Sequence, residues 1–313
     1  EPYAADISEG KNNNIYRAHS YVTKVPHPAI MKFILHYTQP GDIIYDGFAG
    51  TGMTAIAGNF CDNPKKVDKI NLEKSPDLGN IIWGPRKTIV SDLSTLASYI
   101  SGNFNLKVEN YLSLLNSVEE KYKNLKEEFN WLYKTKHSNG QDGVINYVIW
   151  SDVFKCHNCG EDICYYDVAV NLDELKLNDT LICPSCLYSQ NKRELEKSWK
   201  TYYNENLDDS YKLLEAKPVL IKYKYGTQTY TKSPDENDID LLKEIENYKI
   251  KTWLPLSEIP DGYNLNQPKR SHGFKYVTDF FTKRNLIVLS SLFEVLDQRE
   301  KLIFTSLLYR SSR

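Results

Sequence analysis

The sequence predicts an α/β fold with an inserted four-cysteine segment, and three observations support this prediction. A short apolar run at residues 43–45 ends in Asp46 and leads into a glycine-rich turn and a helix-compatible run, which is the order strand, turn and helix. Residues 88–92 form a second short strand, again followed by a helical run. In the middle of the chain, two C-x-x-C pairs are typical of a small metal-binding ribbon.

The length and composition limit the classes of fold and function. The 313 residues suffice for one large α/β domain with an insertion, or for two modest domains. Because the net charge is −2 and 26% of the residues are charged, any contact with nucleic acid must come from a local basic patch. The sequence has neither an apolar run of membrane-spanning length nor a signal-peptide pattern, so we expect no membrane partner. Four of the six cysteines lie in C-x-x-C pairs, which favours a cytoplasmic protein over a secreted disulfide framework.

The residues before the first strand predict a loop and an amphipathic helix. Pro28 suits the first helical turn, and residues 40–42, Pro-Gly-Asp, end the helix ahead of the strand. The apolar residues at helical spacing are Ile30, Phe33, Ile34 and Tyr37.

The glycine turn lies within residues 42–54, Asp-Ile-Ile-Tyr-Asp-Gly-Phe-Ala-Gly-Thr-Gly-Met-Thr. A strand, a glycine turn and a helix start bring a nucleotide-like ligand against exposed backbone N–H groups. The spacing matches neither the dinucleotide pattern GxGxxG nor the phosphate-binding pattern GxxxxGK[ST].

This stretch resembles the S-adenosylmethionine-binding motif of amino-methylating DNA methyltransferases, D-P-F-x-G-[ST]-G-x-T. Gly47 stands where proline is usual, and Ala49 occupies the variable position. The resemblance implies a Rossmann-like methyltransferase sheet with helices on both faces. It also implies a cofactor site formed by Asp46, Gly47, Phe48, Ala49, Gly50, Gly52 and Thr54.

The resemblance extends to the segment before the helix. In these enzymes a Thr-x-Lys-Pro-like element precedes the glycine motif when the order of the motifs is permuted. Its counterpart is residues 23–26, where Thr23 and Lys24 would by this resemblance hold the methionine end of the cofactor. The alternative is an ordinary loop.

The second strand offers a further group to a nucleoside ligand. It ends in Asp92, followed by Leu93, and a carboxylate at this position can accept hydrogen bonds from ribose hydroxyls. Alternatively, Asp92 is the N-cap of the next helix. The distance from Asp46 exceeds the usual twenty or so residues, and we interpret the mostly polar residues 61–86 as an inserted loop, with Cys61 as a structural thiol.

The two C-x-x-C pairs predict a structural zinc site. The candidate ligands are Cys156, Cys159, Cys183 and Cys186. Two such knuckles present four thiolates to a tetrahedral ion, which leaves no open position for an activated water, so we expect no catalysis by this metal. His157 and Cys164 are not needed as ligands, and we expect strands at residues 164–170 and 180–182.

The remaining chain predicts a long amphipathic helix over residues 111–132, a strand at 144–150, a hairpin around Gly226 and a helix opened by the acidic residues 235–240. Two basic segments could contact DNA or could be ordinary solvated surface. They are Lys192, Arg193, Lys197 and Lys200 beside the ribbon, and residues 268–276 with the following residues 280–286, where basic and aromatic side chains are interleaved.

Together with the segment at residues 146–152 that leads into the four cysteines, the second basic segment extends the resemblance to adenine-specific DNA methyltransferases over nearly the whole chain. We therefore expect an S-adenosylmethionine-binding α/β portion at residues 1–150, a zinc ribbon at 151–200, and at 201–313 an α+β region that returns to the methyltransferase domain.

Methyl transfer to an exocyclic amine needs acceptors for its N–H groups and an aromatic ring against the flipped base. Enzymes of this family supply both with a [DNS]-P-P-[YFW] tetrapeptide. The sequence has no Pro-Pro pair, so we name no catalytic residue and expect the cofactor-and-zinc portion of a longer enzyme.

The resemblance implies a site-specific DNA methyltransferase that acts on adenine N6 in preference to cytosine N4. Its implied partners are double-stranded DNA with a flipped base and the remainder of the enzyme or a restriction partner. Two alternatives stay open: a non-catalytic zinc-ribbon module that binds nucleic acid, and a methyltransferase acting on RNA or a small molecule.

Overall fold

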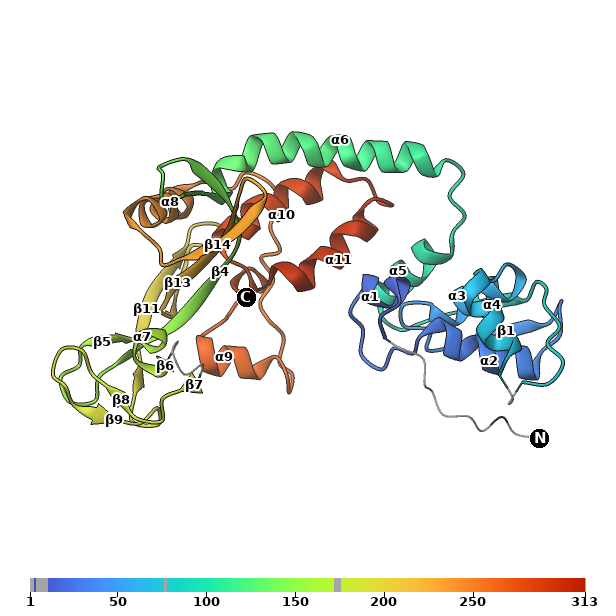
Figure 1. Ribbon diagram of the computed structural model, residues 1–313, viewed down its shortest axis with the longest axis horizontal. Coiled ribbons are helices and arrows are strands. Elements are labelled where there is room, and N and C mark those ends of the chain that lie inside the picture. Colours follow the sequence, from blue (N-terminus) through green and yellow to red (C-terminus); the bar gives the residue numbers. More distant parts are fainter. Residues whose placement is uncertain (1–2, 4–10, 76–77, 172–175, 313) are drawn as a thin grey trace. The chain divides into compact units, whose positions relative to one another are not determined.

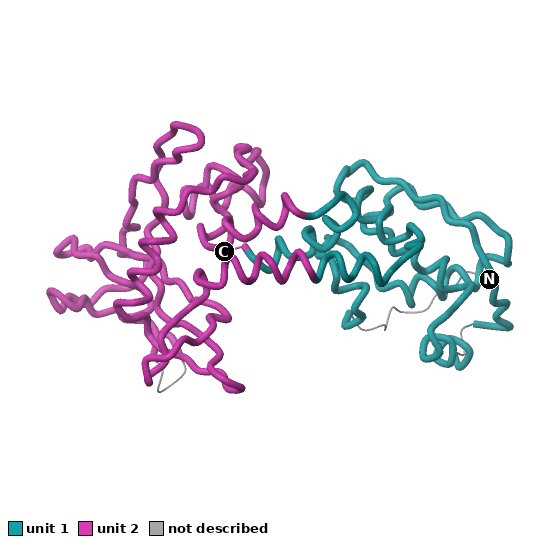
Figure 2. The backbone as a smooth tube through the Cα atoms, turned by 90° about the horizontal axis from the view of Figure 1, so that it is seen from above, with its two compact units in different colours: residues 1–119, 296–311 teal, residues 120–295, 312–313 magenta. Residues whose placement is uncertain are grey.

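The computed structural model describes residue 3 and residues 11–75, 78–171 and 176–312. The chain divides into two compact units (Figure 2): unit 1 contains residues 1–119 and 296–311, and unit 2 contains residues 120–295 and 312–313. Helix α6 (Tyr111–Phe129) begins in unit 1 and ends in unit 2. Among the described residues, no helix combines the length and the apolar character needed to cross a membrane.

Unit 1 consists mainly of helices around two parallel strands. Its elements in chain order are α1 (Asn14–Ala18), α2 (His27–Tyr37), β1 (Ile43–Asp46), α3 (Met53–Asp62), α4 (Lys66–Glu73), β2 (Lys87–Val90), α5 (Thr95–Asn105), the first part of α6, and α11 (Lys301–Ser311) (Figure 1). The structure confirms the predicted helix before the glycine turn (α2), both strands (β1 and β2) and the helices that follow them (α3 and α5). Each forms where the apolar residues have the periodicity of a helix or of a strand.

Strands β1 and β2 pair in parallel, with Asp46 opposite Val90. Helix α3 covers one face of this pair closely, since a Cβ on Gly58 would lie 2.5 Å from Cγ2 of Thr88. The opposite face is exposed, and its side chains are Ile43, Tyr45 and Ile89, 54% to 70% accessible. Parallel sheets are normally covered on both faces, so the exposure of this apolar face departs from the usual arrangement.

The described residues do not show the predicted Rossmann-like sheet with helices on both faces, because their parallel pairing is limited to β1 and β2. After α5 the chain does not continue with further parallel strands. It enters helix α6 and then the antiparallel sheet of unit 2. The fold is mixed helix and sheet, as predicted, but its larger sheet is antiparallel and not parallel.

Residues 61–86, predicted as an inserted loop, contain the helix α4. Leu72 of α4 is buried in the hydrophobic core of unit 1 together with Met31 and Leu35 of α2, and this burial stabilises a helix in a mostly polar stretch. Cys61 lies in the same core and is fully buried, as expected of a structural thiol. Burial raises the pKa of its thiol to about 11.

Unit 2 is built on an antiparallel sheet that curls around a small core. Its elements are η1 (Asn130–Tyr133), β3 (Lys134–Lys136), β4 (Asp142–Lys155), β5 (Asp162–Cys164), α7 (Tyr165–Ala169), β6 (Val170–Asn171), β7 (Lys176–Leu177), β8 (Leu181–Ile182), β9 (Ser189–Gln190), β10 (Glu196–Lys197), β11 (Trp199–Asn204), β12 (Asp209–Leu214), β13 (Ala216–Tyr225), β14 (Gln228–Lys232), α8 (Glu236–Asn247), α9 (Asn266–His272), η2 (Val277–Phe280) and α10 (Lys283–Val295).

Strand β4 belongs to both the sheet and the ribbon. Along its first part it pairs with β3 and β13, and at its end it pairs with β5 and β10, directly before Cys156. Two register shifts in the pairing with β13 bend the sheet. The predicted boundary between residues 150 and 151 lies inside this strand, and the one between residues 200 and 201 lies inside β11.

The ribbon differs from the prediction in one element. Residues 164–170 were expected to be extended, but Tyr165–Ala169 form the helix α7. One helical turn places Ala169 and Val168 against Ile163 and Leu181 in the ribbon core, which a strand with alternating side chains would not do. The turn residues 172–175 lie outside the described residues.

The hairpin of β13 and β14 around Gly226 and the helix α8 are both confirmed. Asp235 is the N-cap of α8 and forms a capping box with Asp238, which explains why an acidic run opens this helix.

Candidate cofactor site and candidate metal centre

The carboxylate of Asp46 holds the glycine turn from the end of β1. Its Oδ1 accepts a hydrogen bond from the backbone N–H of Phe48 at 3.0 Å, and its Oδ2 accepts one from Oγ1 of Thr54 at 2.6 Å. A single side chain therefore connects the strand, the turn and the first turn of α3.

Asp92 holds the same turn from the end of β2. Its Oδ2 accepts a hydrogen bond from the N–H of Gly50 at 2.8 Å, and its Oδ1 accepts one from the N–H of Ser94 at 2.9 Å. These N–H groups, that of Ser94 foremost, lower the pKa of the Asp92 carboxyl, so it is ionised at neutral pH. Asp92 is not the N-cap of α5, because the Oγ of Ser94 fills that role by accepting from Ala97.

Two glycines of the turn are required by close contacts. Gly50 and Gly52 have φ angles of 52° and 78°, in the left-handed region that favours glycine. A Cβ on Gly52 would lie 2.4 Å from Oγ of Ser101 on α5. A Cβ on Gly50 would lie 3.0 Å from the ring of Tyr21, which places the segment before α2 against the turn.

Two buried hydroxyl groups at the turn, one inside the motif and one outside it, have no hydrogen-bond partner among the described residues. They are Oγ1 of Thr51 and Oγ of Ser101. Buried hydroxyl groups usually have a partner, so this pair suits a polar ligand at the turn. A sequence signal for Ser101 exists, since Ser94, Ser98 and Asn105 lie on the same side of α5 at helical spacing.

Apolar side chains project beside the two carboxylates. Phe48 is 85% exposed and Leu93 is 94% exposed. Ala49, in contrast, is buried, and its N–H donates to the carbonyl of Ser91 at 3.0 Å. Gly47 lies under the ring of Tyr45, whose hydroxyl would be 3.1 Å from a Cβ at this position.

Thr23 and Lys24 lie on the segment that Tyr21 anchors to the turn. Thr23 is exposed and has a φ of 62°, an outlier for a β-branched residue. The amine of Lys24 donates to the carbonyl of Tyr16 at 2.6 Å and to that of His19 at 3.2 Å. Burial lowers its pKa to about 8.

The four predicted cysteines converge in the ribbon. All four Sγ atoms lie within 4.8 Å of one another, and they could bind a metal ion. The Sγ atoms of Cys156 and Cys186 are 3.7 Å apart, and those of Cys159 and Cys183 are 3.8 Å apart. Four sulfurs at about 2.3 Å from a tetrahedral zinc ion would be separated by about 3.8 Å.

Two amides donate to the sulfurs of this cluster. Nε2 of Gln190 lies 3.6 Å from Sγ of Cys156, and Nδ2 of Asn158 lies 3.5 Å from Sγ of Cys186. Such N–H groups stabilise thiolates and orient them. Within the described residues neither His157 nor Cys164 joins the cluster, in agreement with the prediction.

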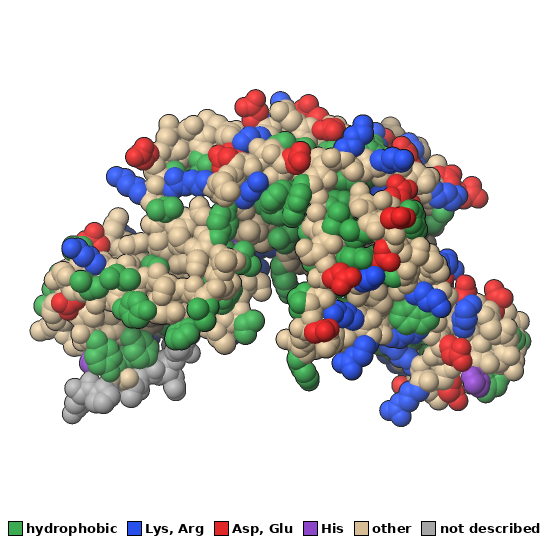
Figure 3. All heavy atoms as spheres, turned by 180° about the vertical axis from the view of Figure 1, so that it is seen from behind, with side chains coloured by type: hydrophobic (Ala, Val, Ile, Leu, Met, Phe, Trp, Pro, Cys, Tyr) green, Lys and Arg blue, Asp and Glu red, His purple; other side chains and the backbone are tan. Residues whose placement is uncertain are grey.

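The basic residues proposed for DNA contact are mostly engaged within unit 2. Nζ of Lys197 donates to the carbonyl of Ser271 at 2.7 Å, and Lys200 pairs with Glu215. Lys192 lies over the ring of Tyr165. In the second basic segment, Lys269 pairs with Asp261 and Lys275 with Asp209. Figure 3 shows basic and acidic side chains interspersed on one face of the molecule, without a continuous basic surface there.

Comparison with known families supports one part of this site. Residues 5–60 match the family model of N6/N4 amino-group enzymes, described as DNA methylase. The match covers the segment with Tyr21 and Thr23, helix α2, strand β1, the glycine turn and most of α3. No curated protein and no solved structure matches the chain. The family match supports a DNA methyltransferase of the amino-group type and does not extend to the ribbon.

Proposed function

We propose that unit 1 is the S-adenosylmethionine-binding portion of a DNA methyltransferase that methylates an exocyclic amine, with adenine N6 preferred over cytosine N4. The observation that carries this proposal is the convergence of Asp46 and Asp92 on one glycine turn, inside and beside the segment that matches the DNA methylase family. In this proposal β1 and β2, with the helices that follow them, are two strand–helix repeats of a Rossmann-like fold.

The residues at the turn fit a nucleoside with a charged methionine tail. The Asp92 carboxylate is partly exposed and keeps lone pairs for ribose hydroxyls, in addition to those used by Gly50 and Ser94. Phe48 and Leu93 offer apolar surface to the two sides of an adenine ring. The unpaired hydroxyls of Thr51 and Ser101 would gain partners in a polar ligand.

In the same proposal, Gly47, Ala49, Gly50, Gly52 and Thr54 shape the turn, and Thr23 and Lys24 approach the methionine end. When bound, the cofactor supplies a methyl group on a sulfonium, which an amine nitrogen can attack in line without a covalent enzyme intermediate. The sequence has no Pro-Pro pair, so we assign no catalytic residue to this chain. The acceptors for the target amine would come from a further segment or a partner.

The four cysteines would hold a structural zinc ion. The Sγ separations of 3.7 and 3.8 Å equal the edges of a zinc tetrahedron, and four thiolates leave no position for an activated water. We therefore propose residues 151–200 as a zinc ribbon that stabilises unit 2 and takes no part in methyl transfer.

Calorimetric titration of S-adenosylmethionine tests the cofactor site. We expect Asp46→Ala and Asp92→Ala to weaken binding about 10- to 100-fold, the effect of losing a hydrogen bond to a charged group. Asp42→Ala is the matched control, because the Asp42 carboxylate accepts a hydrogen bond from the N–H of Gln39 at the opposite end of β1. Absence of binding by well-folded protein would instead favour the non-catalytic nucleic-acid-binding module.

A further inference from the structure

Unit 2 contains a cavity that the proposed function does not use. It has a volume of about 870 Å³, within the usual range for ligand sites, and lies between the turn that joins β3 to β4, the hairpin of β13 and β14, and the start of α8. Its aromatic lining comes from His137, Tyr223 and Tyr230, and its neutral polar lining includes Ser138, Thr231 and Asn237.

The ring of His137 is fixed within an aromatic cluster. It stacks on Tyr225 with a centroid distance of 4.3 Å and an interplanar angle of 16°, and its Nδ1 is 2.8 Å from the hydroxyl of Tyr223. The ring of Tyr230 is 4.7 Å away. The turn is itself closed by a hydrogen bond from the N–H of His137 to the carbonyl of Gln141 at 2.9 Å. The cavity therefore has a preformed aromatic wall, which a ligand need not order.

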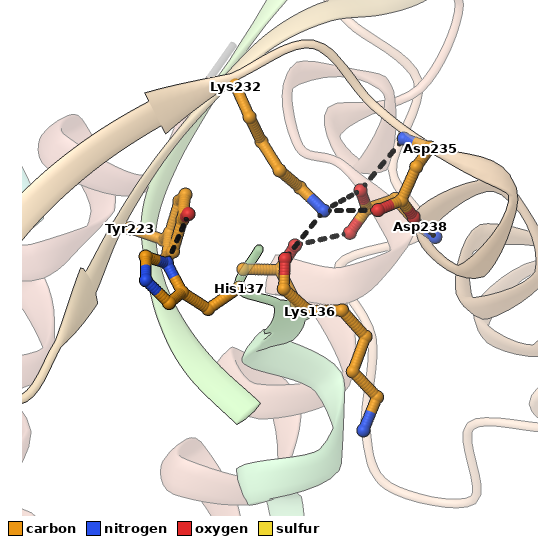
Figure 4. Close-up of polar contacts among 7 residues, drawn as sticks. Lys136, His137, Tyr223, Lys232, Asp235 and Asp238 are labelled. Carbon is orange, nitrogen blue, oxygen red and sulfur yellow. Dashed lines mark hydrogen bonds and ion pairs between the residues drawn. The ribbon is translucent and has the colours of Figure 1, made fainter. Parts of the chain in front are cut away.

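The cations beside the cavity are already neutralised. Figure 4 shows the amine of Lys232 directed toward Asp235 and Asp238, at 2.6 and 2.8 Å. The amine of Lys136 pairs with Asp142 at 2.5 Å. A phosphate would have to compete with these carboxylates, so charge does not favour an anion here. A neutral planar ring with hydrogen-bonding edges matches both the aromatic wall and the amide and hydroxyl groups.

We propose that this cavity binds an unpaired nucleobase of the DNA substrate, stacked on the His137 cluster and held at its edge by Ser138, Thr231 or Asn237. This inference rests on the proposed function for the identity of DNA as substrate. A free nucleotide has the same ring but gains much of its affinity from its phosphate, for which the cavity has no unpaired cation among its described lining residues. A base within a strand needs no phosphate contact in the cavity, because the rest of the strand contributes the remaining contacts.

The test uses the full chain and a single-stranded oligonucleotide that contains the fluorescent base 2-aminopurine. We expect binding to quench the fluorescence, and His137→Ala to weaken binding about tenfold or more, as for removal of a stacking partner. Thr231→Trp should have a similar effect by filling the cavity, and it leaves the His137 cluster intact. Tyr263→Ala is the matched control, since Tyr263 is 96% exposed and is not part of the cavity lining.

Unchanged affinity in both cavity variants would overturn the proposal. Binding of adenosine monophosphate that matches the oligonucleotide in affinity and is lost equally in both variants would overturn the assignment to DNA. The same preparations are titrated with S-adenosylmethionine in the absence of DNA. If all proteins bind S-adenosylmethionine but the cavity variants keep the oligonucleotide affinity of the wild type, the cavity proposal alone is rejected. If none of the proteins, the wild type included, binds S-adenosylmethionine, the proposed function is rejected.

Discussion

The glycine turn and the four-cysteine cluster are both predicted binding sites, but they are stabilised in opposite ways. The turn is held by two carboxylates at the ends of β1 and β2, because Asp46 and Asp92 accept hydrogen bonds from backbone and side-chain groups within it. The cluster brings four sulfurs within 4.8 Å of one another, and four thiolates at such separations repel one another unless a cation lies between them. We infer that the turn forms without its ligand, whereas the ribbon depends on a metal ion.

Removing the metal ligands should have the largest effect. Replacing Cys156 and Cys159 by serine should abolish metal binding and unfold the ribbon, because structural zinc contributes about 10–16 kcal/mol in small zinc domains. Metal analysis should give one ion per chain in the wild type and none in the variant. Serine at Cys164, which lies outside the cluster, is the control. If the ribbon kept its protease resistance after metal removal, its folding would not depend on a metal ion, and the difference inferred between the ribbon and the turn would be wrong.

An intermediate effect is expected at the turn. Gly52→Ala should destabilise unit 1 by about 2–4 kcal/mol, because its φ is 78° and its Cβ would lie 2.4 Å from Oγ of Ser101. Gly102→Ala on α5 has no heavy atom within 4 Å of the new Cβ and should be neutral or stabilising by up to about 1 kcal/mol. Denaturant unfolding measures both. Equal stability of the two variants would mean that the turn is looser than its contacts indicate.

A smaller effect is expected from a buried histidine at the start of helix α2. His27 is fully buried, stacks on Phe60, and both ring nitrogens are without a partner. Burial lowers the pKa of His27 to about 4, so below its unfolded value of 6.5 the unfolded chain binds the extra proton. Stability should therefore fall by about 1–2 kcal/mol between pH 7 and pH 5 from this group.

The matched variant for this effect is His27→Phe, which keeps the stack on Phe60 and removes the proton-binding site. Thermal melting at pH 7 and pH 5 should show a smaller loss of stability in the variant than in the wild type. Parallel curves for the two proteins would show that another group controls the acid response of unit 1.

Local signals in the sequence predicted much of both sites. The apolar run ending in Asp46, the three glycines and the two C-x-x-C pairs each specify a short-range geometry, and β1, α3 and the sulfur cluster follow it. Helix α4 and helix α7 were missed, because their stability comes from burying Leu72 and Ala169 in cores assembled from distant residues. The hydrogen bond between Gly50 and Asp92 is also beyond local patterns, since it depends on the pairing of β1 with β2.

The large sheet could not be derived from the same kind of signal. Strand β4 has 14 residues, but its burial alternates irregularly because its first part pairs within the sheet and its end pairs with strands of the ribbon. Only residues 144–150 showed the periodicity of a strand, so its continuation into the ribbon was not expected.

Strand β4 is shared by the ribbon and the large sheet, so it connects the ribbon directly to the rest of unit 2. One end of β4 follows the turn that carries His137, and the other end leads directly into Cys156. Oxidation of the thiols, by releasing the proposed metal ion, would loosen the structure at one end of this strand. We expect this loosening to be transmitted along β4 and to change the conformation of the turn that carries His137, although the residues around that turn are not themselves modified.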